Sequence, residues 1–183
     1  STDELNGVWN MQIQGNDDPG PIRLTASSMS GTPTDLRFAI IDVPNREVIR
    51  DFFQQDLTIE GRIDHVHDII LIAGEESYLL QMIDDLLADI PEQYSLGQNY
   101  PNPFNPVTKM NFALPRTGDV SIVIYNLMGQ QIRTLVSENM EYGFHTVTWN
   151  GLDQLGRPVS SGVYFSELRA RGFRQTKKML MLK

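Results

Sequence analysis

The chain has no cysteine among its 183 residues, which excludes disulfide bonds and thiolate metal sites but does not identify a redox compartment. It has no lysine before Lys109, and no apolar run approaches the roughly 20 residues that a membrane-spanning helix needs. No signal peptide is recognisable at its start. A sequence that opens on "STDELNG" is expected to be an excised fragment or a mature product.

The two halves of the chain carry opposite net charges. Residues 1–92 hold eighteen Asp and Glu against five Arg, a balance of −13, and residues 93–183 hold ten Lys and Arg against five acids, a balance of +5. Such a split predicts two modules, and the acidic half argues against nucleic-acid binding. The hydrophobic content of 40% is sufficient for packed cores.

Apolar and polar residues alternate through most of the first 74 residues, which predicts short β-strands. In the segment 8–14, Trp9, Met11 and Ile13 share one face, and we expect Trp9 to pack in the core. Further strands are expected at 22–26, 36–43, around Val48, at 57–59 and at 68–73. Six or seven strands in about 70 residues favour a small sandwich.

One amphipathic helix is expected from about Glu75 to Ile90, ended by Pro91. Its apolar residues recur at helical spacing, at Leu79, Ile83, Leu86, Leu87 and Ile90. We expect this stripe to dock within the chain rather than on a partner.

The stretch "YPNPFNP", residues 100–106, places three prolines in seven residues. Each proline fixes φ, removes a backbone donor and pushes the preceding residue toward extended conformations. The segment is therefore expected to be extended, unable to pair continuously, and a boundary between the two halves.

Strands resume after this segment, and the count favours a second sandwich. They are expected at 108–114, 119–126, 132–136, 143–151, 163–170 and 173–183. The last two are expected to form a hairpin through Arg171 and Gly172, and the terminal strand to turn Leu180 and Leu182 inward.

Several separated motifs in the second half occur in a recognisable order: "LGQNYPNPFNPVT", "ALPRTGDVSIVIYNLMGQQIRTLV", "GFHTVTWNGLDQLGRPVSSGVYF" and "TKKMLMLK". With them, residues 94–183 resemble the type A C-terminal sorting domain of the type IX secretion system of Bacteroidetes and their relatives. The central part also resembles the Ig-like domain of flagellar hook-capping proteins, which argues for the fold rather than a flagellar role. Asn150 departs mildly from the Asp that often follows the tryptophan in the sorting-domain motif.

The strand and helix patterns, together with the resemblance over residues 94–183, predict an all-β fold of two Ig-like antiparallel β-sandwiches joined by an amphipathic helix and a proline-rich linker. The expected domains are a sandwich of unassigned role over 1–74, a linker helix over 75–92 and the sorting domain over 93–183. Residues 1–74 lie outside the resemblance to the sorting domain. They look, more weakly, like the β-rich segments that precede such domains in large surface proteins.

The resemblance also implies a function, as the C-terminal fragment of a secreted or cell-surface bacterial protein. The last domain would be a non-catalytic address, read by outer-membrane machinery after export through the periplasm and usually removed by a sortase-like peptidase. The expected partners are that machinery, its peptidase and upstream cargo domains, with no nucleic acid and no cofactor. Phe104 would be a hydrophobic plug where the chain enters the sandwich. The residues implied in recognition are Pro101, Asn102, Pro103, Phe104, Gly162, Tyr164, Lys177, Lys178 and Lys183.

Signals for catalysis and for metals are weak. The adjacent acids at Asp17–Asp18, Glu75–Glu76 and Asp84–Asp85 point apart on a strand or a helix, so they indicate solvated surface rather than an acid/base pair. His145 is interpreted as a core histidine with a satisfied hydrogen bond. The turn segments "NDD" and "DQLG" offer oxygen ligands but match no defined calcium loop.

The segment "DHVHD", residues 64–68, places His65 and His67 on one face of a strand and Asp64 and Asp68 on the other. Two imidazoles at this spacing would need a third ligand to hold zinc or copper, and none is nearby in the sequence. An ordinary polar edge is therefore the favoured interpretation.

Two other functions stay open. One is a structural or adhesive stalk of tandem sandwiches, which is compatible with sorting. The other is ligand binding, for example of a glycan, by residues 1–92 through Trp9, Phe52, Phe53 or Tyr78, and an exposed Trp9 would keep it open. The basic tail, with only Phe173 to stack on bases, favours an acidic protein surface over nucleic acid.

Overall fold

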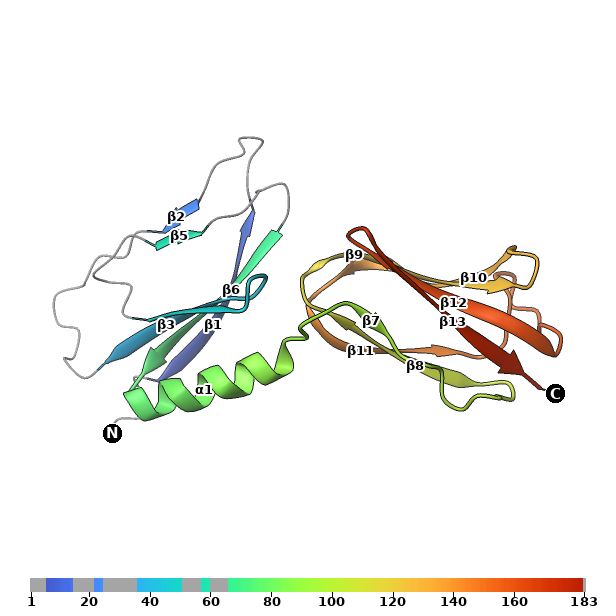
Figure 1. Ribbon diagram of the computed structural model, residues 1–183, viewed down its shortest axis with the longest axis horizontal. Helices are drawn as coiled ribbons and strands as arrows, with labels where there is room; N and C mark the ends of the chain where they lie inside the picture. Colours follow the sequence, from blue (N-terminus) through green and yellow to red (C-terminus); the bar gives the residue numbers. More distant parts are fainter. Residues whose placement is uncertain (1–5, 15–21, 25–35, 51–56, 60–65, 183) are drawn as a thin grey trace. The chain divides into compact units, whose positions relative to one another are not determined.

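The computed structural model describes residues 6–14, 22–24, 36–50, 57–59 and 66–182 (Figure 1). These residues form thirteen strands and one helix, so the protein is mostly β, as predicted. The chain divides into two compact units, residues 1–90 and residues 91–183. Each unit is described separately below.

The first unit contains every strand expected in the first 74 residues. They are β1 (Gly7–Gln14), β2 (Ile22–Leu24), β3 (Arg37–Asp42), β4 (Glu47–Arg50), β5 (Leu57–Ile59) and β6 (Val66–Gly74). Four strands form an antiparallel sheet in the order β1-β6-β3-β4, and β2 pairs with β5 in a second, two-stranded sheet.

The two central strands of the larger sheet, β3 and β6, carry the core of this unit. Adjacent residues are buried on both, Ile40 and Ile41 on β3 and Ile69 and Ile70 on β6, so both faces of these strands are covered. This explains their nearly continuous apolar sequences, which alternation alone would not produce.

Trp9 corrects one sequence-based expectation. Its side chain is 50% exposed and that of Met11 is 39% exposed, so the expected core packing of Trp9 is wrong. Alternation groups residues by face but does not say which face is buried. Because Trp9 is exposed, the ligand-binding hypothesis for residues 1–92 stays open.

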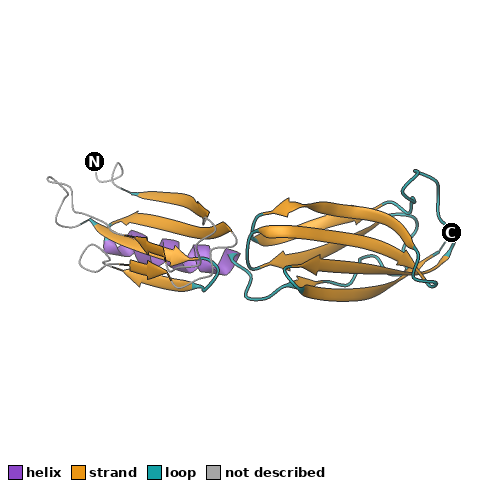
Figure 2. Ribbon diagram, turned by 90° about the horizontal axis from the view of Figure 1, so that it is seen from above, coloured by secondary structure: helices purple, strands orange, loops and turns teal. Residues whose placement is uncertain are grey.

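The predicted helix is present as α1 (Glu76–Asp89). It packs against β3 and β6 through Leu79 and Ile83, so its apolar stripe docks within the chain as expected (Figure 2). The last turn of α1 has no basic residue. The guanidinium of Arg46, from the turn between β3 and β4, instead donates to the carbonyl oxygens of Ile90 and, at 3.1 Å, of Leu87. This cation satisfies carbonyls that have no partner within the helix.

The second unit consists of seven strands in two antiparallel sheets. They are β7 (Ser95–Leu96), β8 (Thr108–Leu114), β9 (Gly118–Asn126), β10 (Gln131–Met140), β11 (Gly143–Trp149), β12 (Gly162–Ala170) and β13 (Phe173–Met181). The sheet orders are β10-β9-β12-β13 and β11-β8-β7. One core fills the space between the sheets, with Met110 and Phe112 from β8 facing Ile122 of β9 and Leu168 of β12.

The terminal strand β13 corrects a second expectation. Met179 and Met181 are buried, at 0% and 1% exposure, whereas Leu182 is 48% exposed, so the inward face predicted for Leu180 and Leu182 is wrong. In "MLML" both alternating sets are apolar, so the pattern does not specify a face. The face is set by pairing with β12 through the hairpin at Arg171 and Gly172, both with positive φ.

Replacing Leu79 by alanine should destabilise the first unit by about 2–5 kcal/mol, because it leaves a cavity between α1 and the sheet. Leu80 is the matched control. It is the next residue of the same helix but is 44% exposed, and its replacement should change stability by about 0.5 kcal/mol or less. Urea unfolding of the full chain, followed by the helical circular dichroism signal, measures both. Equal losses would contradict the packing of α1.

Candidate recognition site around the terminal strand

The proline segment bends at residues 101–103 and 105–106 just before β8 and lies inside the second unit, so the extended conformation and the boundary role predicted for it are wrong. The backbone of Tyr100 exchanges two hydrogen bonds with that of Lys109, at 2.8 and 3.0 Å. The next three residues, Pro101, Asn102 and Pro103, are exposed, and the peptide bonds preceding both prolines are cis. Beyond these two bonds to Lys109, proline leaves this part of the chain few backbone donors.

Two buried side chains hold the exposed segment from below. The amide of Asn99 donates to the carbonyl oxygen of Pro101 at 2.9 Å and to the hydroxyl oxygen of Thr108 at 3.0 Å. The Thr108 hydroxyl in turn donates to the same Pro101 carbonyl at 2.9 Å. Asn99 and Thr108 are 2% and 0% exposed, so this network lies inside the unit and fixes the turn.

The residue next to the exposed turn, Phe104, enters the core and is 2% exposed. Its ring lies 5.4 Å from that of Trp149, centroid to centroid. Its backbone N–H donates to the carbonyl of Leu180 at 3.0 Å, and its carbonyl accepts from the N–H of Leu182 at 2.9 Å. Phe104 thus fills the end of the sandwich and pairs with the last strand.

Side-chain amides continue this contact along β13, which is an edge strand of its sheet. Asn102 Oδ1 accepts from the N–H of Leu180 at 2.9 Å, and Gln98 Nε2 donates to the carbonyl of Lys178 at 2.8 Å. An unpaired strand edge would otherwise be open to pairing with other chains. Because prolines cannot supply a ladder of donors, amide side chains replace it here.

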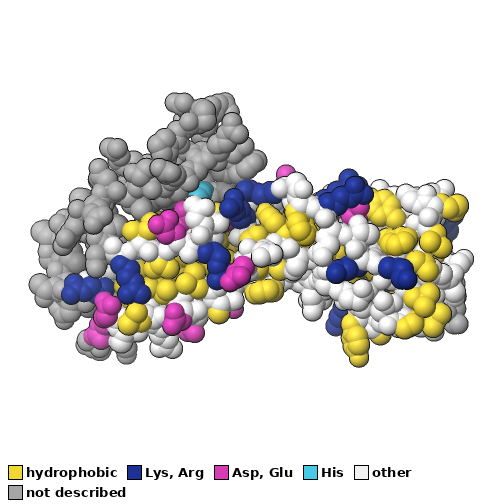
Figure 3. Space-filling model, in the orientation of Figure 1, with side chains coloured by type: hydrophobic (Ala, Val, Ile, Leu, Met, Phe, Trp, Pro, Cys, Tyr) yellow, Lys and Arg dark blue, Asp and Glu magenta, His cyan; other side chains and the backbone are white. Residues whose placement is uncertain are grey.

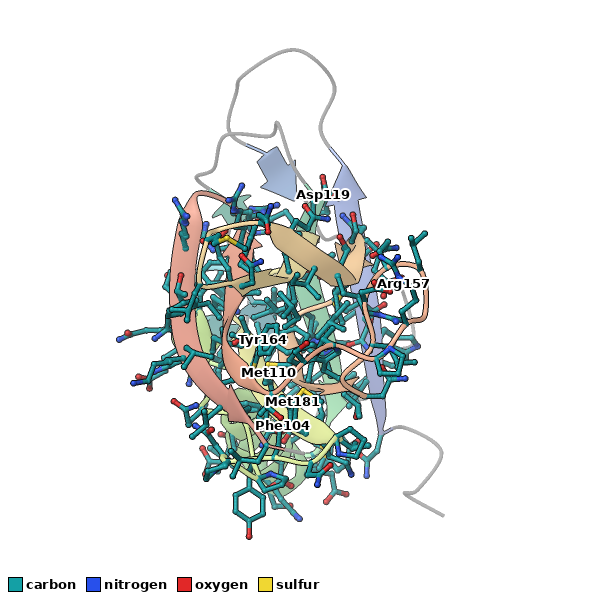
Figure 4. The ribbon with its side chains drawn as sticks, turned by 90° about the vertical axis from the view of Figure 1, so that its right-hand side faces the viewer. Phe104, Met110, Asp119, Arg157, Tyr164 and Met181 are labelled. Carbon is teal, nitrogen blue, oxygen red and sulfur yellow. The ribbon has the colours of Figure 1, made fainter. Side chains whose placement is uncertain are left out.

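The opposite edge of β13 pairs with β12, where Gly162 lies across from Met181 and Tyr164 from Met179. The Tyr164 hydroxyl donates to the carbonyl of Ser160 at 2.8 Å, and its ring packs edge-on against Trp149 at 5.2 Å. Figure 4 shows Phe104, Tyr164 and Met181 close together at this end of the unit.

Gly151 packs closely against both the end of β13, at Met181, and the proline segment, at Pro106. A Cβ there would lie 2.9 Å from Met181 Cε and 3.0 Å from the carbonyl oxygen of Pro106, and its φ is +69°. Both the close approach and the left-handed backbone require glycine. The neighbouring Asn150, where the sorting-domain motif often has Asp, is exposed.

The basic residues expected in the signal differ in their surroundings. Lys178 is exposed, whereas Lys177 is half-buried and lies across from Ser166 of β12. Lys183 lies outside the described residues. Among the residues that are described, neither Lys177 nor Lys178 has a carboxylate partner within 4.0 Å.

A buried carboxylate fastens the outer face of β13 to β12. Glu167 is 3% exposed and accepts from Nε of Arg169 at 2.5 Å and from Nε of Arg174 at 2.6 Å, with the Thr176 hydroxyl at 3.5 Å. Burial raises the pKa of Glu167, but the hydrogen bonds and charges of the two arginines outweigh it and hold that pKa below its usual value.

Thus most of the residues singled out from the sequence converge on β13. The structure brings Asn102, Phe104, Gly162, Tyr164 and Lys178 to the two edges and the outer face of one strand. The sequence analysis did not single out Asn99, Thr108 or Gln98. The sequence offered one signal for these three residues, which is that each is polar and lies close to a run of prolines that lacks backbone donors.

The residues considered for chemistry have structural partners. His67 Nε2 lies 3.0 Å from Asp42 Oδ1, and Asp68 accepts from the amide of Gln12 at 2.9 Å. Asp42 has its pKa lowered, because His67 and Asn45 outweigh the effect of burial. The residues Asp64 and His65 lie outside the described part of the chain. Within the described part, no group of three or more His, Asp or Glu is placed to hold a metal ion.

The remaining candidates are also engaged within the fold. His145 is half-buried, stacks on Phe112 at 5.2 Å and hydrogen-bonds the Glu141 carbonyl at 2.9 Å, so its hydrogen bond is satisfied as predicted. Both oxygens of Asp153 in "DQLG" accept hydrogen bonds from Arg157. The segment "NDD" and Asp17–Asp18 lie outside the described residues, and Glu75, Glu76, Asp84 and Asp85 are exposed.

A family match is consistent with the fold of the second unit. Residues 101–172 match the FlgD Ig-like domain family, so this unit contains an Ig-like domain. No curated protein matches the chain. In the described residues, no helix combines the length and the apolar character that crossing a membrane requires.

Solved structures resemble the chain only distantly. FlgD from P. aeruginosa is 20% identical with a TM-score of 0.34, over 40% of this chain and 60% of that chain. PorZ, a surface component of the type-IX secretion system of Porphyromonas gingivalis, is 17% identical with a TM-score of 0.35, over 62% of this chain and 14% of that one. Dimeric latent PorU of the same species is 12% identical with a TM-score of 0.40, over 97% of this chain and 18% of that chain. The chain thus spans 60% or less of each of them.

Replacing Phe104 by alanine should destabilise the second unit by about 3–5 kcal/mol, because it empties the end of the core and loosens the pairing with β13. Tyr100 is the control. It lies in the same segment but is 81% exposed, so its replacement by alanine should have little effect. Thermal unfolding followed by the fluorescence of Trp149 measures both changes. A Phe104 variant as stable as the Tyr100 variant would contradict the role assigned to Phe104.

The Glu167→Gln variant tests the clamp on β13 through its pH dependence. The pKa of Glu167 is lower in the folded than in the unfolded chain. Its ionisation therefore stabilises the fold at every pH above the pKa of the unfolded chain. That stabilisation is lost as the pH falls through the pKa that Glu167 has in the folded chain. The variant should therefore be less stable than the wild type at neutral pH, and the gap should close in acid. A gap independent of pH, measured by urea unfolding across this range, would contradict the clamp.

Proposed function

We propose that residues 91–183 form a non-catalytic C-terminal sorting domain that is read by the type IX outer-membrane secretion machinery. The protein would then be secreted or held at the cell surface. Its partners would be that machinery, its sortase-like peptidase and cargo domains upstream in the same polypeptide. The observation that carries the proposal is the convergence of the motif residues on β13. Asn102, for example, hydrogen-bonds Leu180 of this strand, 78 positions away in the sequence.

The exposure of the motif residues supports recognition of a folded surface. Pro101, Asn102, Pro103 and Lys178 are exposed and available to a partner. Phe104, Tyr164, Met179 and Met181 are buried and hold the exposed set in place. A receptor that contacts this surface would therefore read the last strand and the proline turn together, and only in the folded domain.

We further propose that the first unit is a second Ig-like sandwich that acts as a spacer. Its four-stranded and two-stranded sheets and its buried β3 and β6 support this arrangement. A tandem of such units also suits a structural or adhesive stalk, which is the alternative function. The exposed Trp9 favours a test of glycan binding by the same unit.

Secretion of a reporter tests the sorting function. The full chain, fused behind a periplasm-exported fluorescent protein, should carry it to the surface or the medium in a host with the type IX machinery and leave it in the periplasm of a mutant without it. Lys178→Glu should lower secretion about tenfold or more, since it reverses the charge at an exposed motif residue. Arg171→Glu is the matched control, at an exposed cation in the hairpin at the other end of β13. Periplasmic retention in both hosts would overturn sorting and favour the stalk.

A further inference from the structure

Two loops of the second unit share one five-residue structure, in the sequences "NLMGQ" (126–130) and "DQLGR" (153–157). We refer to them together as the tip turns. The first joins β9 to β10, and the second lies in the connection from β11 to β12. Both place an Asn or Asp first, a large apolar residue third and a glycine fourth.

The hydrogen bonds of the tip turns correspond one to one. Asn126 Oδ1 accepts from the backbone N–H of Met128 at 3.0 Å and of Gln130 at 2.9 Å. Asp153 Oδ1 accepts from the N–H of Leu155 at 2.9 Å and of Arg157 at 2.8 Å.

The backbone bonds of the two turns also match. The fourth residue's N–H donates to the first residue's carbonyl at 3.0 Å in both turns, and the first residue's N–H donates to the fifth residue's carbonyl at 3.0 and 2.9 Å. The two glycines have φ of +74° and +77°. Each turn is therefore closed by its own backbone and its leading side chain, which makes it rigid.

These rigid turns hold apolar side chains out in solvent. Met128 is 78% exposed, Leu155 is 75% exposed and Leu127 is 70% exposed. Turn positions ordinarily take polar residues, and the hydrogen bonds that close these turns do not involve the exposed apolar side chains. Presentation on a pre-organised turn reduces the conformational entropy lost on binding, as in the anchors of protein interfaces.

The second turn is fixed to the start of β10, the strand that directly follows the first turn. The N–H of Gln154 donates to the Ile132 carbonyl at 2.9 Å, and Gln154 Oε1 accepts from the N–H of Thr134 at 3.1 Å. The Arg133 guanidinium also donates to the Asp153 carbonyl at 3.1 Å. Because the first turn leads directly into β10, both turns are attached to the same end of this strand.

This surface adjoins the motif residues around β13. Asn126 pairs with Tyr164, and Gly162 pairs with Met181, so the tip turns and the end of β13 share one end of the sandwich. Leu182 and Val107, also at this end, are 48% and 45% exposed. Figure 3 shows hydrophobic side chains at this end of the unit, and Figure 4 labels Arg157 of the second turn.

The charges of the tip turns cancel. Asp153 and Arg157 are the charged residues of the two turns, and they pair with each other at 2.8 Å. The two turns themselves therefore carry no net charge, which suits an apolar protein pocket better than an anionic lipid surface. It is complementary to apolar, uncharged pockets on a protein.

We propose that the tip turns are a docking surface for a protein component of the secretion machinery, and that Met128 and Leu155 enter two apolar pockets on that partner. This inference rests on the proposed sorting function and adds a second contact to it, separate from the proline turn and β13. Leu127 and Leu182 would lie at the margin of the contact.

The test uses the full chain fused to the exported reporter. The double variant Met128→Asp, Leu155→Asp should lower secretion about tenfold or more while its melting temperature stays that of the wild type, because both side chains are exposed. The swap Met128→Leu, Leu155→Met should secrete normally, since it keeps both anchors apolar. Phe144→Asp is the control, at an apolar residue that is 68% exposed at the opposite end of the sandwich.

Photo-crosslinking gives a second readout. Met128→p-benzoylphenylalanine should form a protein adduct in the host with the machinery and none in the host without it, and Phe144→p-benzoylphenylalanine should form none in either. A wild-type fusion that is secreted equally with the double aspartate variant would overturn the docking surface alone. A wild-type fusion retained in both hosts would overturn the sorting function and the docking surface with it. Self-association in sedimentation, or binding to vesicles of anionic lipid, abolished by the double variant would assign the surface to a second copy or to a membrane and overturn the proposal.

Discussion

The second unit depends on how its last strand is held. β13 pairs with β12 along one edge, and along the other it is covered by Gln98, Asn102 and the backbone of Phe104. An edge strand without such cover would present unpaired backbone groups to other chains. The prolines prevent the covering segment from becoming an ordinary strand, so the cover is made of side-chain amides and one aromatic residue. Trp149 and Gly151 pack against the same end, which links the middle of the domain to its last residues.

Polar groups in this unit are arranged so that buried ones support exposed ones. Asn99 and Thr108 are nearly inaccessible to solvent, yet they fix the exposed turn at Pro101. Glu167 is buried between two exposed arginines and ties the outer face of β13 to β12. The same principle operates in the tip turns, where Asn126 and Asp153 order the backbone beneath exposed apolar residues. A pre-organised surface of this kind loses little conformational entropy on binding.

The first unit has a different organisation. Its two central strands are buried on both faces, and α1 covers part of one face with its end secured by Arg46. A side-chain hydrogen bond between Asp42 and His67 links β3 to β6 beside this core. Trp9 lies outside this core, half exposed on β1.

The sequence by itself predicted the types and approximate positions of the helix and of twelve strands, because period-two and helical patterns are local properties, but it missed β7 and the second half of β10. It also separated the proline turn from the strands and marked Phe104 through the family resemblance. It did not determine which face of a strand is buried when both are apolar, as at Met179 and Leu180, or how much of an apolar face is covered, as at Trp9. It also missed Asn99 as a buried support and Arg46 as a helix cap. Only the tertiary structure decided these, because each depends on a contact with a different element: β12 for Met179, Thr108 for Asn99 and the end of α1 for Arg46.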